Sequence, residues 1–189
     1  MKKTIATLFL TTAAFFGIQN LSAQETTINA AESSIHWLGK KVTGQHEGNI
    51  SLVSGKLEME GDVLTGGSFT VDMGSMTVTD IEGEYAEKLK GHLKSDDFFG
   101  VATHPEATLT FTSVEAKGSY LYTVTGDFTI KGKTNPATFD LQISLGAATA
   151  KVIIDRSLYG IRYGSTSFFD NLGDKAIYND FELDVTLKL

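Results

Sequence analysis

The sequence predicts an all-β fold, in which about eight antiparallel strands close into a barrel or stack as a sandwich. Apolar and polar residues alternate with a period of two along most of the chain, as they do in strands that bury one face. Nineteen glycines against two prolines favour many tight turns. Strands with one apolar face must cover that face, and a barrel or a sandwich does so within a single domain of 189 residues.

Residues 1–23 have the features of a secretory signal peptide. They begin with two lysines, continue through an apolar run between Ile5 and Ile18, and end on the small residue Ala23. This run is shorter than the roughly 20 residues that a transmembrane helix needs. We therefore expect residues 24–189 to form one exported domain without a transmembrane span, in the periplasm or outside the cell. An N-terminal membrane anchor is the alternative.

Seven alternating runs follow residue 24 and mark the expected strands. Apolar residues recur at every second position in each run. These positions are Ile35 and Trp37; Leu57 and Met59; Phe69, Val71 and Met73; Leu109 and Phe111; Tyr120, Tyr122, Val124, Phe128 and Ile130; Ala137, Phe139, Leu141 and Ile143; and Phe181, Leu183, Val185, Leu187 and Leu189. Glycine-containing turn signals separate the runs at residues 60–62, 66–67, 117–119 and 131–133.

One segment departs from this period and predicts a short helix at about residues 82–94. Tyr85, Leu89 and Leu93 are spaced four residues apart, so they share one side of a helix. The segment is an insertion between the third and fourth runs. An insertion at that place fits a plug or a lid at one end of a barrel.

Charge and cysteine content exclude several classes of function. The formal net charge is −7, which argues against nucleic acid as a partner because phosphate binding needs clustered lysine and arginine. The chain has no cysteine and therefore no disulfide framework, thiol nucleophile or cysteine-built metal site. No Gly-x-Ser-x-Gly nucleophile motif occurs. We assign no catalytic residue and expect no cofactor.

The four histidines lack the spacing of a metal site. No two of them lie four residues apart, and none belongs to a His-Glu-x-x-His motif. We interpret His46 and His92 as hydrogen-bonded, partly buried imidazoles at a turn or a helix end, and His36 as solvated. The sequence therefore predicts no metal site, although one assembled from distant strands stays open.

The sequence of residues 126–134 is similar to the motif of a phosphate-binding loop but does not match it. They carry five residues between Gly126 and the Gly-Lys-Thr at 132–134, where the motif has four. They also lie in a strand–turn–strand run, which offers no helix N-terminus to hold a phosphate. We therefore predict a hairpin turn at residues 131–134.

Large apolar side chains gather on one parity of the expected strands. In a small barrel such residues either fill the interior or line a cavity for one ligand, and the period alone leaves both interpretations open. For a cavity, the expected lining residues are Trp37, Phe69, Val71, Leu109, Phe111, Tyr120, Tyr122, Phe128, Phe139, Leu141, Phe181 and Leu183.

The sequence resembles the YceI-like family over essentially the whole mature chain. The blocks that carry the resemblance are residues 91–99 (GHLKSDDFF), 104–111 (HPEATLTF) and 124–134 (VTGDFTIKGKT) with its apolar continuation at 137–139. Residues 155–163 and the loop at 165–171 match only part of the family. The resemblance implies an exported, antiparallel, eight-stranded barrel of lipocalin-like architecture, whose long hydrophobic cavity holds a polyisoprenoid or a related lipid.

The function implied by this resemblance is the non-catalytic binding of an amphiphilic lipid, such as a polyisoprenoid, by a carrier or a sequestering protein. Arg156 and Arg162 are candidate contacts for an anionic headgroup, and surface ion pairs are the alternative for both. A lipid-processing enzyme that uses the same cavity and a structural module with a packed core stay open. A barrel with an apolar rim often forms a homodimer, and the sequence leaves the oligomeric state open.

Overall fold

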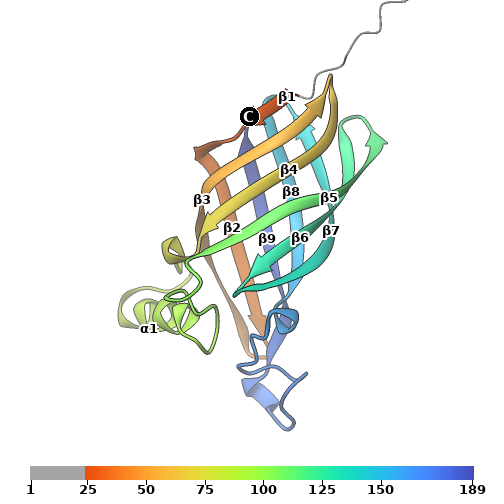
Figure 1. Cartoon of the computed structure of the whole chain (residues 1–189). Helices are drawn as coiled ribbons and strands as arrows, with labels where there is room; N and C mark the ends of the chain where they lie inside the picture. Colours follow the sequence, from red (N-terminus) through yellow and green to blue (C-terminus); the bar gives the residue numbers. More distant parts are fainter. Residues whose placement is uncertain (1–23) are drawn as a thin grey trace, which may run out of the picture.

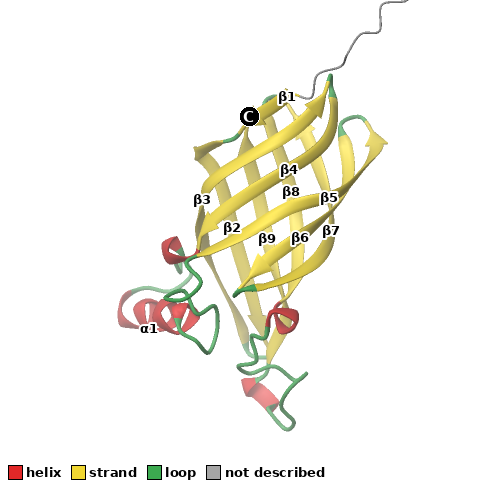
Figure 2. Cartoon of the chain, in the orientation of Figure 1, coloured by secondary structure: helices red, strands yellow, loops and turns green. Residues whose placement is uncertain are grey.

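Nine strands and one α-helix make up residues 24–189, the part of the chain that the computed structural model describes (Figure 1). The expected signal peptide, residues 1–23, lies outside the described residues. The strands are β1 (Gln24–Thr27), β2 (Asn29–Lys41), β3 (Gly44–Glu60), β4 (Val63–Asp72), β5 (Glu106–Gly118), β6 (Leu121–Ile130), β7 (Lys133–Ser144), β8 (Ala147–Asp155) and β9 (Ile177–Lys188). The helix is α1 (Gly83–Lys94), and the 3-10 turns are η1 (Met73–Ser75), η2 (Arg156–Tyr159) and η3 (Gly173–Lys175) (Figure 2).

The strands close into a barrel in which every pairing is antiparallel. β1 pairs with Lys56–Met59 of β3, and β2 pairs with Gly44–Ile50 of the same strand. The order continues from β2 through β9, β8, β7, β6 and β5 to β4, and the pairing of β4 with β3 closes the ring. Because β1 and β2 share one side of β3, the barrel has eight strand positions. The predicted eight-stranded, antiparallel, all-β barrel is confirmed.

The two ends of the barrel differ. Tight turns join β3 to β4, β5 to β6 and β7 to β8 at the upper end in Figure 1, which we call the turn end. The opposite end, the helix end, carries η1, α1, η2 and η3 in the long connections from β4 to β5 and from β8 to β9. Connections of this length leave room for an opening that the tight turns do not.

The helix α1 lies at the helix end and confirms the predicted helix to within one residue. Glu84 in its first turn and Lys94 in its last turn carry the charges that the helix dipole favours at those positions. None of its residues is fully buried. Among the residues that the structure describes, no helix is both long enough and apolar enough to cross a membrane.

Three of the four predicted turns are confirmed. Residues 61–62, 119–120 and 131–132 form turns, and Lys131 and Gly132 have the positive φ angles, 50° and 70°, of a two-residue hairpin. The fourth prediction is wrong, because residues 66–67 lie inside β4. A Cβ at Gly67 would come within 2.9 Å of the Phe111 ring, so this glycine makes room for an aromatic side chain.

The strand β8 has no counterpart among the seven expected runs. Its inward residues Ala148, Val152 and Ile154 are buried, and they alternate with the exposed Thr149 and Lys151. The alternation is real, but alanine and threonine differ too little in polarity to mark it clearly.

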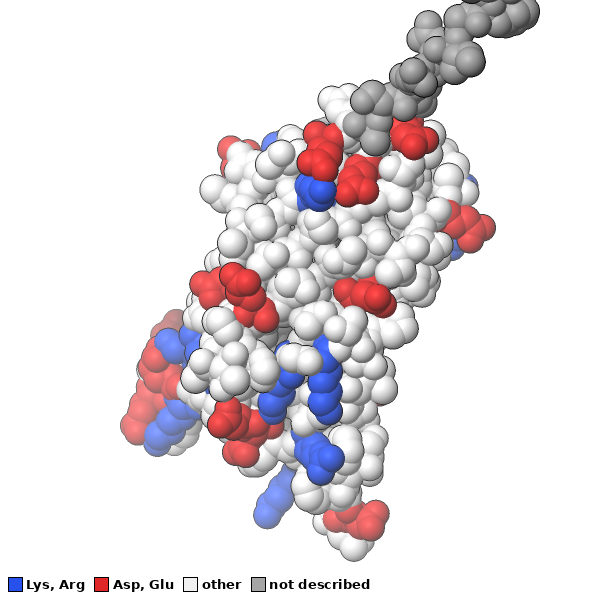
Figure 3. All heavy atoms as spheres, in the orientation of Figure 1, with Lys and Arg blue, Asp and Glu red and all other residues white. Residues whose placement is uncertain are grey.

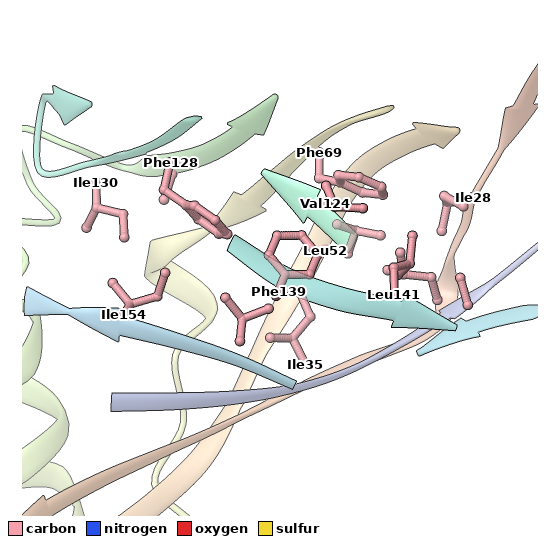
Figure 4. Close-up of a cluster of buried hydrophobic side chains, with 14 of the residues drawn as sticks. Ile28, Ile35, Leu52, Phe69, Val124, Phe128, Ile130, Phe139, Leu141 and Ile154 are labelled. Atoms are coloured by element: carbon pink, nitrogen blue, oxygen red, sulfur yellow. The ribbon is translucent and has the colours of Figure 1, made fainter. Parts of the chain in front are cut away.

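The interior is filled at the turn end. Leu57, Leu64 and Leu141 are at most 2% exposed. The hydroxyl of Tyr122 donates to the carbonyl oxygen of Asp62 at 3.3 Å and accepts the backbone N–H of Leu64 at 3.4 Å. The bonds of Tyr122 and the three buried leucines fill the turn end. Figure 4 shows other buried apolar side chains, such as Phe69, Phe128 and Phe139, that point into the barrel from several strands.

Candidate functional site

A cavity of about 240 Å³ lies inside the barrel and reaches the helix end. Its wall consists of the inward side chains of β2 to β9, as expected for a barrel whose strands alternate inside and outside. Ten of the twelve predicted lining residues lie on this wall: Trp37, Phe69, Val71, Leu109, Phe111, Phe128, Phe139, Leu141, Phe181 and Leu183. Their contact with a ligand stays a prediction.

Two tyrosines do not line the cavity, so this part of the prediction is corrected. Tyr120 lies in the turn between β5 and β6 with a φ of 59°, and it is 55% exposed. Its parity in the sequence matches the inward residues, but the strand begins only at residue 121. Tyr122 belongs to the filled turn end, where its hydroxyl bonds the backbone of the β3–β4 turn and of β4.

Four phenylalanines contact one another along one wall of the cavity. The ring centroids are 5.5 Å apart for Phe69 and Phe111, 6.0 Å for Phe111 and Phe139, and 6.1 Å for Phe139 and Phe128. These tilted and edge-to-face arrangements are the ones that aromatic pairs favour. The four residues lie on neighbouring strands, β4 to β7, so the rings pack along the wall and the centre of the barrel stays open.

The helix end contributes lining residues that the sequence analysis did not include. Leu89 and Leu93 of α1 face the cavity, as do Phe98, Phe99 and Met76 from the segments around the helix. The four-residue spacing of the two leucines was the available signal, because an apolar side on an exposed helix must cover something. This placement agrees with the expected plug or lid.

A short segment after η1 lies along β3 at the mouth of the cavity. The N–H groups of Thr77 and Thr79 donate to the carbonyl oxygens of Asn49 and Glu47, both at 2.9 Å. Asp80 ends this segment and accepts the N–H of Glu47 at 3.1 Å. These bonds extend the sheet where β4 no longer covers β3.

His46 lines the cavity mouth and pairs with Asp80. Its Nδ1 lies 2.7 Å from Asp80 Oδ2, and its side chain is 31% exposed, which confirms a hydrogen-bonded, partly buried imidazole. Burial alone would raise the pKa of Asp80, but hydrogen bonds from the Glu47 N–H and from His46 outweigh it and lower that pKa. The carboxylate is therefore charged and holds the orientation of the ring.

His92 and His36 are also partly exposed imidazoles beside carboxylates. His92 lies near the end of α1, 3.4 Å from Asp97 and edge-on to the Tyr163 ring, as expected for a partly buried imidazole at a helix end. His36 is 35% exposed and lies 3.8 Å from Glu47. Within residues 24–189, no group of three His, Asp or Glu side chains is placed to hold a metal ion.

Arg156 is a buried cation on the cavity wall. It is 4% exposed and lies in η2. Its guanidinium donates to the carbonyl oxygens of Tyr178 at 3.1 Å, Ile161 at 3.1 Å and Ile177 at 3.0 Å. Burial lowers the pKa of Arg156, and the nearby Asp155 acts in the opposite direction. Sequence reasoning found the residue but not its burial, because its acceptors come from η2's own loop and from β9.

Arg162 lies outside the cavity. Its guanidinium stands 4.9 Å over the Phe168 ring, and it borders a separate hollow together with Asp96, Asp97 and Lys175. The structure therefore brings only one of the two predicted headgroup arginines to the cavity wall.

The comparison with protein families decides which family this barrel represents. Residues 27–189 match the YceI-like domain. The chain belongs to the YceI-like family. A similar relative is Protein YceI of Escherichia coli O157:H7, which is 39% identical over 69 residues, 36% of this chain and 35% of that protein. The match thus spans about a third of that relative's length. A UPF0312 protein of Shewanella denitrificans is 26% identical over 177 residues, 72% of this chain and 91% of that protein.

Solved structures share the YceI-like fold with this chain. BcnA of Burkholderia cenocepacia has a TM-score of 0.68 and 20% identity, covering 85% of this chain and 98% of that one. A polyisoprenoid binding domain from Saccharophagus degradans has a TM-score of 0.61 and 17% identity, covering 88% of this chain and 97% of that one. A YCEI protein of Campylobacter jejuni has a TM-score of 0.53 and 16% identity, covering 100% of this chain and 98% of that one. At these identities the likeness concerns the fold.

Proposed function

We propose that this chain binds a polyisoprenoid or a similar amphiphilic lipid in the barrel cavity, without catalysis, as a carrier or a sequestering protein. The observation that carries the proposal is the cavity itself, which is walled by aromatic and aliphatic side chains and reaches one end of the barrel. The likeness of the fold to a protein named as a polyisoprenoid binding domain supports the same ligand class.

The proposed binding needs no catalytic group. Each CH₂ removed from water stabilises the complex by about 0.8 kcal/mol, so a stretch of ten carbons contributes roughly 8 kcal/mol before the cost of ordering. The ring wall made by Phe69, Phe111, Phe139 and Phe128 supplies rigid apolar surface for such a chain. Arg156, on the same wall, is the proposed contact for the polar end of the lipid.

The location of the protein is part of the proposal. We propose that residues 1–23 direct export and that the barrel works in the periplasm, where a water-insoluble molecule needs a protein to cross an aqueous space. The cavity wall comes from one chain, so binding does not require a second copy. A homodimer stays an expectation from the sequence.

A cavity-blocking variant tests the proposal. Ala150 of β8 lines the cavity, whereas its neighbour Thr149 faces outward and is exposed. We expect Ala150→Phe to abolish uptake of a fluorescent polyisoprenoid analogue and Thr149→Phe to leave it unchanged, with thermal melting as a check of folding. Mass spectrometry of an organic extract of the purified protein should find a lipid in the parent and less in Ala150→Phe.

The two alternative functions make different forecasts. A structural module would take up no lipid in any variant. A lipid-processing enzyme would return a chemically altered lipid, and His46→Ala would then stop the conversion while binding survives. For the proposed carrier, the lipid recovered after incubation is unaltered in the parent and in His46→Ala.

A further inference from the structure

Two cations at the cavity mouth lack an acidic partner. The basic and acidic residues that border the cavity are Lys40, Lys41, His46, Arg156 and Asp180. Lys40 bonds Glu182, and His46 bonds Asp80. Among the described residues, neither Lys41 nor Arg156 has a carboxylate oxygen within 4 Å. Asp180 lies on the exposed side of β9.

Lys41 and Arg156 are both neighbours of Ile177 in β9. Lys41 has the same parity as Ile35 and Trp37 in the β2–β3 ladder, borders the cavity and is half-buried, and the β2–β9 ladder is irregular between Gly39 and Lys41. Its partner across the β2–β9 ladder is Ile177. The carbonyl oxygen of Ile177 accepts the Nη2–H of Arg156 at 3.0 Å. Both side chains also border the cavity.

The bonds of Arg156 leave part of its guanidinium available. The group has five N–H donors, and three of them go to backbone carbonyl oxygens. The two remaining N–H groups lie one on each terminal nitrogen, and the Phe98 ring centroid is 5.8 Å from the guanidinium carbon. A planar guanidinium fork matches a carboxylate or a phosphate. Carbonyl dipoles satisfy hydrogen bonds but do not neutralise a buried positive charge, and such a charge is costly without an anion.

Lys41 and Arg156 are positively charged, whereas the protein as a whole has a formal net charge of −7. On the face drawn in Figure 3, lysine and arginine side chains lie mainly on the lower half, toward the helix end, where acidic side chains also lie, and the upper half is mainly acidic. Cations without a carboxylate partner beside an apolar cavity attract an anion, so they would orient an amphiphile with its charged group toward them.

We propose that the lipid held in this cavity carries an anionic headgroup, a phosphate or a carboxylate, and that Lys41 and Arg156 bind it at the mouth. This inference rests on the proposed function, because the apolar part of the ligand must occupy the barrel. It adds the headgroup class and assigns Lys41, which has no acidic partner of its own, to the site.

Chain-matched probes separate this inference from the proposed function. Farnesol and farnesyl phosphate have the same hydrocarbon chain and differ in charge at one end. Displacement of a fluorescent lipid, at low salt and below the micelle concentration, should show farnesyl phosphate binding at least about tenfold tighter than farnesol. Hexadecanoate and hexadecanol form a second chain-matched pair, in which the charged group is a carboxylate. Comparing the preference for the charged probe in the two pairs shows whether the site favours a phosphate or a carboxylate.

Substitution at the mouth tests the residues. We expect Lys41→Met to weaken farnesyl phosphate about tenfold and to change farnesol less than about twofold. The control is Lys117→Met, since Lys117 lies on the outer surface of β5, 3.2 Å from Asp140. Arg156→Lys keeps one positive charge but not the fork, and its melting temperature shows whether the η2 contacts survive.

The outcomes are distinct. Equal affinities within both probe pairs, or equal losses for farnesol and farnesyl phosphate in Lys41→Met, overturn the anionic headgroup. Failure of all four probes to bind overturns the proposed function itself. Preference for the charged probe that disappears in Lys41→Met and persists in Lys117→Met supports the assignment.

Discussion

The indole N–H of Trp37 donates to the carbonyl oxygen of Thr77 at 3.1 Å. This bond joins an inward side chain of β2 to the segment that follows η1 at the cavity mouth. It passes over Gly48, the residue opposite Trp37 in the β2–β3 ladder, where a Cβ would lie 1.9 Å from the same carbonyl oxygen. The Trp37 hydrogen bond therefore holds the mouth segment in place, and the absence of a side chain at Gly48 leaves the space that the Thr77 backbone occupies.

Loss of the tryptophan bond should loosen the mouth segment. Trp37→Phe keeps an aromatic ring on the wall and removes the donor, so the free energy of unfolding should fall by about 1 kcal/mol or more. Hydrogen exchange at Thr77 and Thr79 should become faster than in the parent. Phe181→Leu, another change on the wall, serves as control. Exchange rates that stay equal to the parent's in Trp37→Phe would contradict this role of the bond.

A side chain at position 48 should damage the same region. Gly48→Ala places a methyl group against the Thr77 backbone, so we expect a loss of roughly 2–4 kcal/mol in urea unfolding. Gly91→Ala is the matched control, because Gly91 lies inside α1 with open space around it, and it should gain up to about 1 kcal/mol. A parent-like stability of Gly48→Ala would show that the segment is free to move aside.

Acid should weaken the seam between β2, β9 and β8 through one carboxyl group. Hydrogen bonds from Lys151 and Lys40 lower the pKa of Glu182 to about 2, from an ordinary value of 4.5. A carboxyl with a lowered folded-state pKa stabilises the fold above its unfolded pKa and loses that effect as the pH falls from 4.5 towards 2. Glu182→Gln should therefore show a shallower loss of stability over this range.

The measurement is the urea midpoint of the parent and of Glu182→Gln at several pH values between 2 and 6. Glu87→Gln, on the exposed surface of α1, should follow the parent at every pH. A direct titration of the Glu182 carboxyl by NMR should have its midpoint near 2, and a midpoint near 4.5 would refute the expectation.

Alkali should act on a different residue. Burial, followed by the charges of Asp155 and Asp127, raises the pKa of Tyr159 from 10.0 to about 12. Stability that depends on this neutral hydroxyl is complete below pH 10 and is lost as the pH rises through 12. In a spectrophotometric titration, Tyr159→Phe should remove a tyrosine that ionises near pH 12. An unchanged late phase in Tyr159→Phe would contradict the assignment.

The barrel and the helix were predictable because their signals are periodic. Two-residue alternation runs through residues such as Phe69 and Val71, and a four-residue spacing marks Leu89 and Leu93. The same alternation misplaced Tyr120, since periodicity does not show where a strand ends. It also missed β8, whose alanines carry little contrast.

The polar part of the site was harder to predict. The inward position of Lys41 follows from extending the Ile35–Trp37 parity by four residues, and that extension was available in the sequence. The burial of Arg156 was not, because its acceptors Ile161 and Ile177 approach only when the β8–β9 connection folds back on β9. Local patterns report faces of strands, and they do not report which loop meets which strand.

The plugged far end of the tube has a consequence for traffic through it. Because Tyr122 and buried leucines fill that end, the lipid that we propose would enter and leave through the same opening. A lipid that entered with its hydrocarbon end first would leave with its polar end first. An acceptor would therefore contact the polar end before the hydrocarbon. Guests longer than the tube would trail into water and could not thread through it.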